Sequence, residues 1–178
     1  MFKYASESFV VITQLMLPSH SNFSGKVHGG HILNLMDQIA FACASKHSNH
    51  YCVTASVNRV DFLNPIEVGE LVTLKASVNY TGKTSMVVGV RVESENIQKK
   101  TTKHCNSSYF TMVAKDVDGN NVHVPGLIVD DMRGVRRFAR SIIRLKQAKK
   151  RDTKFTAENF KIEEHLELLK QQNILLNL

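Results

Sequence analysis

The chain has 178 residues, 43% of them hydrophobic, and a formal net charge of +7. This length suits one hydrophobic core, so we expect a single domain followed by a tail. The first residues lack the basic start and apolar run of a signal peptide, and no stretch reaches the roughly 18 apolar residues of a membrane span, which predicts a cytoplasmic protein.

The first predicted element is a strand at residues 9–17 (FVVITQLML), which is rich in β-branched and apolar residues and is followed by Pro18. The loop after it, SHSNFSGKVHGG, contains Gly25, Gly29 and Gly30. Glycines at this density predict a backbone that bends tightly or approaches a neighbour closely.

A helix is predicted from residue 31 to about residue 47, because apolar residues recur there at intervals of three and four. A helix with such a wide apolar face packs against a sheet. Asp37 lies at the border of this face, where a carboxylate is costly unless it is exposed in a cleft or has a chemical role. The structural alternative is a carboxylate bound to a neighbouring backbone group or lysine.

Four further strands are predicted at residues 51–62, 71–80, 85–93 and 105–115, where β-branched and alternating residues predominate. Turn-forming residues separate them, including Asn64-Pro65 and Thr81-Gly82-Lys83. The order of one strand, one long helix and four strands predicts an α+β domain, in which one helix packs on an antiparallel sheet. We place this domain at residues 1–126.

The tail, residues 127–178, begins with a basic helical stretch at residues 133–154. Such a block can contact nucleic acid, lipid or a phosphate-bearing ligand, or it can be a solvated helix face. Aromatic residues other than Phe138 are not interleaved with the basic ones, so we expect no nucleic-acid partner. The remaining residues predict an amphipathic helix with apolar positions at Ile162, Leu166, Leu168, Leu169, Ile174 and Leu175.

The three cysteines, Cys43, Cys52 and Cys105, are odd in number and lack metal-ligand spacing to any histidine. This pattern argues against a disulfide framework and against a zinc site. We therefore expect three buried thiols and no metal.

Three segments, NFSGKVHGGHILNLMDQIAFACASKH, CVTASVNRVDFLNPIEVGE and YTGKTSMVVGVRVES, together resemble the acyl-CoA hydrolase branch of the hotdog thioesterases over about residues 9–125. In that family a loop Asn precedes Gly-x-Val-His-Gly-Gly, which opens the helix, and Met-Asp or Met-Glu follows two turns later. Asn22, residues 25–30 and Met36-Asp37 occupy these positions.

The resemblance implies a hotdog fold, an acyl-CoA substrate with no further cofactor, and a dimer with interfacial active sites that assembles into a hexamer. It assigns catalysis to Asn22 and Asp37. The coenzyme A contacts would be Ala55, Ser56 and Val57, then Thr84, Ser85 and Met86, with Lys83 as a nearby cation. Arg137 and Arg144, together with Arg136 and Arg140, would attract the 3′-phosphate or simply solvate a helix face.

Thioester hydrolysis requires an activated water and stabilisation of an oxyanion. The helix start at Gly29 and Gly30 offers amide groups without intrahelical partners and a favourable dipole. Asp37 would act as a general base on water or as a nucleophile, with Asn22 orienting the carbonyl or the water.

Three alternatives compete with this interpretation. A non-catalytic acyl-CoA sensor would use the same pocket, and nucleic-acid binding would use residues 133–154. The related hotdog dehydratases use a histidine with an acidic residue, but no suitable acid follows His28. We therefore expect His28 to be a structural residue of the helix start, and His31 to be exposed or packed.

Overall fold

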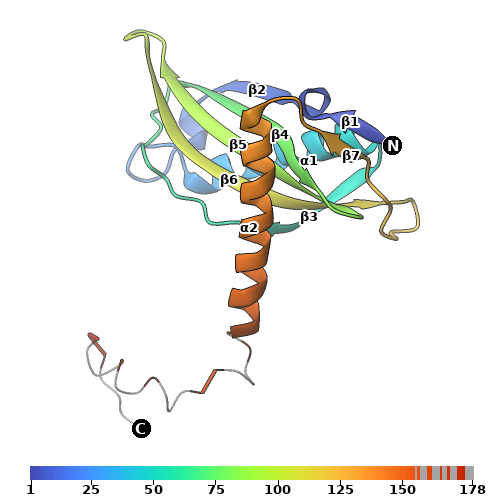
Figure 1. Cartoon of the computed structure of the whole chain (residues 1–178). Helices are drawn as coiled ribbons and strands as arrows, with labels where there is room; N and C mark the ends of the chain where they lie inside the picture. The colour runs from blue at the N-terminus through green and yellow to red at the C-terminus, as the bar shows by residue number, and fades with distance from the viewer. Residues whose placement is uncertain (155, 157–159, 162–164, 166–167, 169–171, 175–178) are drawn as a thin grey trace. The chain divides into compact units, whose positions relative to one another are not determined.

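Five strands form one antiparallel sheet in the computed structural model, in the order β2-β4-β5-β6-β3 (Figure 1). The sheet curls around one long helix, α1, so the predicted α+β arrangement is confirmed. The strands are β2 (Val10–Leu15), β3 (Tyr51–Val57), β4 (Leu71–Thr81), β5 (Ser85–Asn96) and β6 (Thr101–Lys115).

The structure describes all residues except 155, 157–159, 162–164, 166–167, 169–171 and 175–178. The chain divides into two units, Met1–Ala139 and Arg140–Leu178. The predicted amphipathic helix rests largely on Ile162, Leu166, Leu169 and Leu175, which lie outside the described residues, and it stays a prediction.

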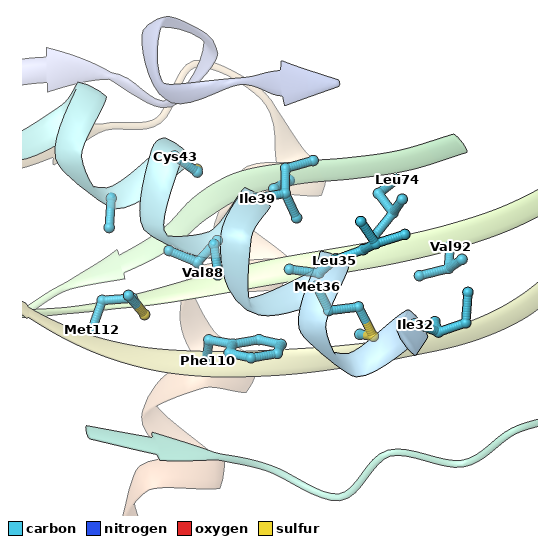
Figure 2. Packing of buried hydrophobic residues seen from close by; sticks show 14 of the residues in the cluster. Ile32, Leu35, Met36, Ile39, Cys43, Leu74, Val88, Val92, Phe110 and Met112 are labelled. Carbon is cyan, nitrogen blue, oxygen red and sulfur yellow. The ribbon is translucent and has the colours of Figure 1, made fainter. Parts of the chain in front are cut away.

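Helix α1 (Gly29–Ser48) supplies the centre of the core. Its residues Ile32, Met36 and Ile39 are buried against side chains from the inner face of the sheet, such as Leu74 and Phe110 (Figure 2). The buried positions of β4 alternate along the strand, as a sheet with one face on the core requires. This packing fixes the side of α1 that carries Asp37.

Strand β3 ends at Val57, five residues before its predicted end. The backbone N–H of Asn58 makes one more bond to β6, at the carbonyl of Tyr109 (3.0 Å). Beyond it, the Ser108 hydroxyl donates to the carbonyls of Asn58 (3.0 Å) and Arg59 (3.4 Å). A side chain thus replaces the backbone ladder, and the chain continues as a loop.

A small parallel pair joins the two ends of the first unit and was not predicted. It consists of β1 (Phe2–Tyr4) and β7 (Gly126–Ile128). Two 3₁₀ turns, η1 (Ala5–Ser8) and η2 (Pro18–His20), flank β2. Helix α2 (Met132–Lys154) confirms the predicted basic helix. No helix in the described part of the chain is long and apolar enough to cross a membrane.

Candidate active site

Helix α1 begins at Gly29, two residues earlier than predicted, because His28 caps it. The His28 Nδ1 atom accepts a hydrogen bond from the Gly30 N–H at 2.9 Å. The prediction that His28 is a structural residue of the helix start is confirmed. Of the two backbone amides expected to face the substrate, the Gly30 N–H is therefore already hydrogen-bonded to the cap. The Gly29 N–H has no partner among the described residues.

Gly29 also lies beneath an aromatic ring. A Cβ atom added there would come within 3.2 Å of Cζ of Phe62, a half-exposed residue of the loop after β3. Glycine therefore allows the loop to pack close to the helix start. The free amide of Gly29 consequently lies at the junction of two segments.

Asn22 closes the loop that precedes α1. Its side-chain Oδ1 accepts hydrogen bonds from the Ser24 N–H (3.0 Å), the Ser24 hydroxyl (2.7 Å) and the Lys26 N–H (3.2 Å). This is the turn-forming role typical of asparagine. The Asn22 Nδ2 group has no partner within the described chain, so its two N–H groups are available to a ligand.

Asp37 is exposed on α1 and bonded to strand β3. The Thr54 hydroxyl donates to Asp37 Oδ1 at 2.6 Å and lies 3.4 Å from Sδ of Met112. Sequence reasoning did not identify Thr54, although a signal existed. Cys52 is a buried residue of β3, and strand periodicity places Thr54 on the same face, toward the helix.

A cleft of about 400 Å³ opens beside this pair, between α1 and β3. Its aromatic wall is formed by Phe41 and Tyr51, whose rings meet edge to face with centroids 5.4 Å apart. The remaining lining residues are Asp37, Gln38, Cys52, Val53 and Thr54. A carboxylate thus lies at the border of a partly apolar hollow, as a site for a thioester requires.

The residues expected to contact coenzyme A fall into two groups. Ala55, Ser56 and Val57 are exposed at the end of β3, after a register shift between Thr54 and Ser56. The second group surrounds the turn between β4 and β5, which the Gly82 N–H closes by donating to the Ser85 carbonyl at 2.7 Å. This group comprises Lys83, Thr84, Ser85 and Met86.

Within the second group, Lys83 is exposed and Met86 is completely buried. The Met86 side chain belongs to the core, so only its backbone can face a ligand. The carbonyl of Thr84 already accepts from the Ala114 N–H at 3.0 Å. The side chains of Thr84 and Ser85 are partly exposed and remain available to a ligand.

Of the two predicted arginines, Arg137 belongs to the first unit, as the cleft does. Arg137 lines a cavity on the outer face of the sheet, where its Nη1 donates to the Ser77 hydroxyl at 3.5 Å. Arg144 belongs to the second unit and is partly buried within α2. Arg137 is not among the residues that line the cleft at Asp37.

The remaining reactive side chains near α1 are structural. Burial raises the pKa of the Cys43 thiol to about 12, which excludes it as a nucleophile at neutral pH. Cys52 and Cys105 are buried and free as well, as predicted. The His31 ring stacks on His20 with centroids 4.0 Å apart, and burial, followed by repulsion from His20, lowers the pKa of His31. The described residues contain no metal-binding cluster of His, Cys, Asp or Glu.

The model of the thioesterase superfamily matches residues 24–101. Protein VdlD of Helicobacter pylori is 44% identical over 110 residues, which cover 62% of this chain and 63% of VdlD, so the matched region spans less than two thirds of that relative. The uncharacterized acyl-CoA thioester hydrolase YkhA of Bacillus subtilis is 31% identical over 149 residues, covering 84% of this chain and 87% of YkhA.

Solved structures share the fold. A hexameric acyl-CoA thioesterase matches with a TM-score of 0.83 and 35% identity, covering 85% of this chain and 97% of its own. The acyl-CoA hydrolase of Staphylococcus aureus, solved with butyryl coenzyme A, matches with a TM-score of 0.80 and 30% identity, covering 96% and 100%. That hydrolase has also been solved with one asparagine, one aspartate or one threonine replaced by alanine, at intervals equal to those separating Asn22, Asp37 and Thr54.

Proposed function

The chain belongs to the acyl-CoA hydrolases of the hotdog-fold thioesterase superfamily, and on this basis we propose that it hydrolyses acyl-CoA to a free fatty acid and coenzyme A. The observation that carries the proposal is the Asp37 carboxylate, fixed by the Thr54 hydroxyl at 2.6 Å beside the cleft between α1 and β3. A carboxylate held in one orientation next to a hollow can act on a bound thioester.

Asp37 would act through the oxygen that Thr54 leaves free. As a general base, this oxygen takes a proton from water while the water oxygen bonds to the thioester carbonyl carbon. The tetrahedral intermediate then collapses, the carbon–sulfur bond breaks, and the coenzyme A thiolate takes up a proton. As a nucleophile, the same oxygen would displace the thiolate to form an anhydride, which water would hydrolyse.

The oxyanion would be stabilised at the start of α1. The Gly29 N–H is the stronger candidate, because the Gly30 N–H already donates to His28. An amide at a helix N-terminus, aided by the helix dipole, favours the developing negative charge. Gly30 would then serve the site through the cap that fixes the helix start, and the free Nδ2 of Asn22 would orient the carbonyl or the water.

The solved variants of the Staphylococcus aureus hydrolase support this choice of residues. The three substituted positions are an asparagine, an aspartate and a threonine with the spacing of Asn22, Asp37 and Thr54. Two of these residues follow from the sequence motif, and the third emerges from its hydrogen bond to Asp37. We therefore include Thr54 in the site as the residue that positions the carboxylate.

Coenzyme A would lie along the exposed end of β3 at residues 55–57 and the turn at residues 83–86, and Arg137, which lines the cavity on the outer face of the sheet, is not among the proposed contacts. Strand β3 pairs with β6 along one edge, and its other edge has no strand partner in the described chain. Such an edge favours pairing with a second copy. We propose a dimer joined through β3, assembled into a hexamer like the thioesterase that shares this fold, in the cytoplasm.

The test is release of free thiol from a panel of acyl-CoAs of short to long chain, measured with a thiol-reactive dye on the purified protein. We expect turnover with at least one chain length. Binding of acyl-CoA without thiol release over the whole panel would instead identify a non-catalytic acyl-CoA sensor.

A further inference from the structure

The outer face of the sheet, opposite the core, carries a polar row of small side chains. Val78 and Val88 are buried in the core, so the preceding residue of β4, Ser77, and the following residue of β5, Gly89, face the other side. These two residues are paired across the strands, and Gly89 is paired in turn with Tyr109 of β6. The small residues leave a hollow beside the tyrosine.

A β-bulge directs an amide group into this hollow. In the ladder between β4 and β5, Val78 pairs with Val88 and Tyr80 pairs with Val87, which leaves Asn79 as the extra residue. Bulges re-aim side chains and occur often next to functional sites. Asn79 is only 5% exposed, yet it lines the cavity on the outer face.

Hydrogen bonds determine which atom of Asn79 faces the hollow. Arg137 donates to the Ser77 hydroxyl at 3.5 Å, and this hydroxyl donates to Asn79 Oδ1 at 3.2 Å. Asn79 Nδ2 lies over Gly89, where any Cβ atom would overlap it. No described group accepts from this nitrogen, so a nearly buried donor is left for a ligand that accepts hydrogen bonds.

The cavity is also strongly cationic. It has a volume of about 450 Å³ and contains Lys75, Arg91, Arg133 and Arg137 but only one carboxylate, Glu93. Glu93 is bound by Lys75 at 2.6 Å and by Arg91 at 2.7 Å. Four cations against one carboxylate leave a positive field over the Asn79 donor.

We propose that this cavity binds a small molecule that carries a phosphate or pyrophosphate group. Arginine, lysine and amide donors converge there, and arginine is suited to bidentate contacts with phosphate oxygens. The cavity has enough volume for a pyrophosphate group together with part of the molecule that carries it.

The site is separate from the thioester cleft. The cleft at Asp37 and Thr54 lies between α1 and β3, whereas the cavity lies on the outer face over β4, β5 and β6. An adjoining hollow contains Asp130 and Asp131, and the Asp131 side chain is engaged in capping α2 at the Gly134 N–H (2.6 Å). The cationic part around Asn79 is therefore the part that takes an anion.

The experiment is calorimetric titration of the full chain with inorganic pyrophosphate at low ionic strength, where screening is weak. Arg133→Gln removes one exposed cation of the cavity, and Asn79→Asp replaces the donor by a carboxylate of the same shape. Lys99→Gln removes another exposed charge, from the turn between β5 and β6, and is the matched control. Thermal melts verify that each variant is folded.

We expect saturable binding that is weakened about tenfold in Arg133→Gln, lost in Asn79→Asp and unchanged in Lys99→Gln. Saturating coenzyme A should leave the pyrophosphate affinity unchanged. The proposal would be overturned if pyrophosphate did not bind, or if Lys99→Gln weakened binding as much as Arg133→Gln. It would also be overturned if coenzyme A displaced pyrophosphate, because the cavity would then bind the diphosphate of the substrate itself. The titration needs no turnover, so its failure leaves the proposed hydrolysis untouched.

Discussion

The Thr54 hydroxyl donates a hydrogen bond of 2.6 Å to Asp37 Oδ1 and so joins strand β3 to helix α1 at the mouth of the cleft. The bond uses one carboxylate oxygen and holds the other in a defined direction. Hydrogen bonds to charged groups are among the stronger ones in proteins, because they are charge-assisted. Thr54 is therefore expected to affect the rate of the reaction more than the stability of the fold.

Replacing Thr54 by valine preserves the side-chain shape and removes the hydroxyl. We expect kcat for acyl-CoA to fall about tenfold to a hundredfold, because a hydrogen bond to a charged group contributes about 1.5–3 kcal/mol. Thr13→Val is the matched control, since Thr13 binds the hydroxyl of Thr73 at 3.1 Å on an exposed strand. Equal rate losses in both variants would count against a specific role for Thr54.

The His28 cap should contribute measurably to stability. His28→Ala removes the acceptor of the Gly30 N–H, and we expect the free energy of unfolding to fall by about 1 kcal/mol. His28→Asn, which offers another side-chain acceptor at the N-cap, should recover most of this loss. His50→Ala, at an exposed position, is the control for losing an imidazole. Chemical denaturation followed by circular dichroism measures all three variants.

His47 should make the fold sensitive to acid. It is fully buried, its Nε2 donates to the Pro125 carbonyl at 3.0 Å, and its Nδ1 has no partner among the described residues. Burial lowers the pKa of His47 below its ordinary value of 6.5, and the Lys3 ammonium lowers it further against the opposing effect of the Pro125 bond. Protonation would place an unpaired N–H and a charge in the interior.

Stability depends on pH because the pKa of His47 is lower in the folded chain than in the unfolded chain. Between pH 6.5 and the lower pKa of the folded state, the unfolded chain binds more protons at this residue, so stability falls as the pH falls through that window. We expect the loss of unfolding free energy between pH 7 and pH 5.5 to be smaller in His47→Gln than in the unmodified chain. His50→Gln should leave the loss unchanged, and an unchanged loss in His47→Gln as well would refute the assignment.

Much of the fold could be predicted because the longer elements have clear periodicity. Helix α1 and strand β4 were predicted within two residues of their observed bounds, whereas β5 extends three residues further and β6 begins four residues earlier than predicted. The pair of β1 and β7 could not be predicted, since each strand has three residues and their pairing joins opposite ends of the first unit. The early start of α1 was missed because two glycines are poor helix formers, and the His28 cap that compensates for them is a local contact.

Part of the proposed site follows from the sequence. Asp37 stands out as a carboxylate beside an apolar stripe, and the loop motif identified Asn22 and the glycines. Strand periodicity places Thr54 on the helix side of β3, but its bond to Asp37 forms only when β3 lies beside α1, because the bond joins two different elements. Asn79 depends on a bulge in the ladder, and strand alternation alone does not reveal a bulge.

The most direct test of the central claim is thiol release by Asp37→Asn, a change that keeps the size of the side chain and its acceptor for Thr54 but removes the base. Asp61→Asn is the matched control, because Asp61 is an exposed carboxylate bound to Arg59 at 2.7 Å. We predict that kcat falls at least about a hundredfold in Asp37→Asn, with coenzyme A affinity retained and Asp61→Asn fully active. An Asp37→Asn protein that hydrolyses acyl-CoA at the rate of the unmodified chain would contradict the account.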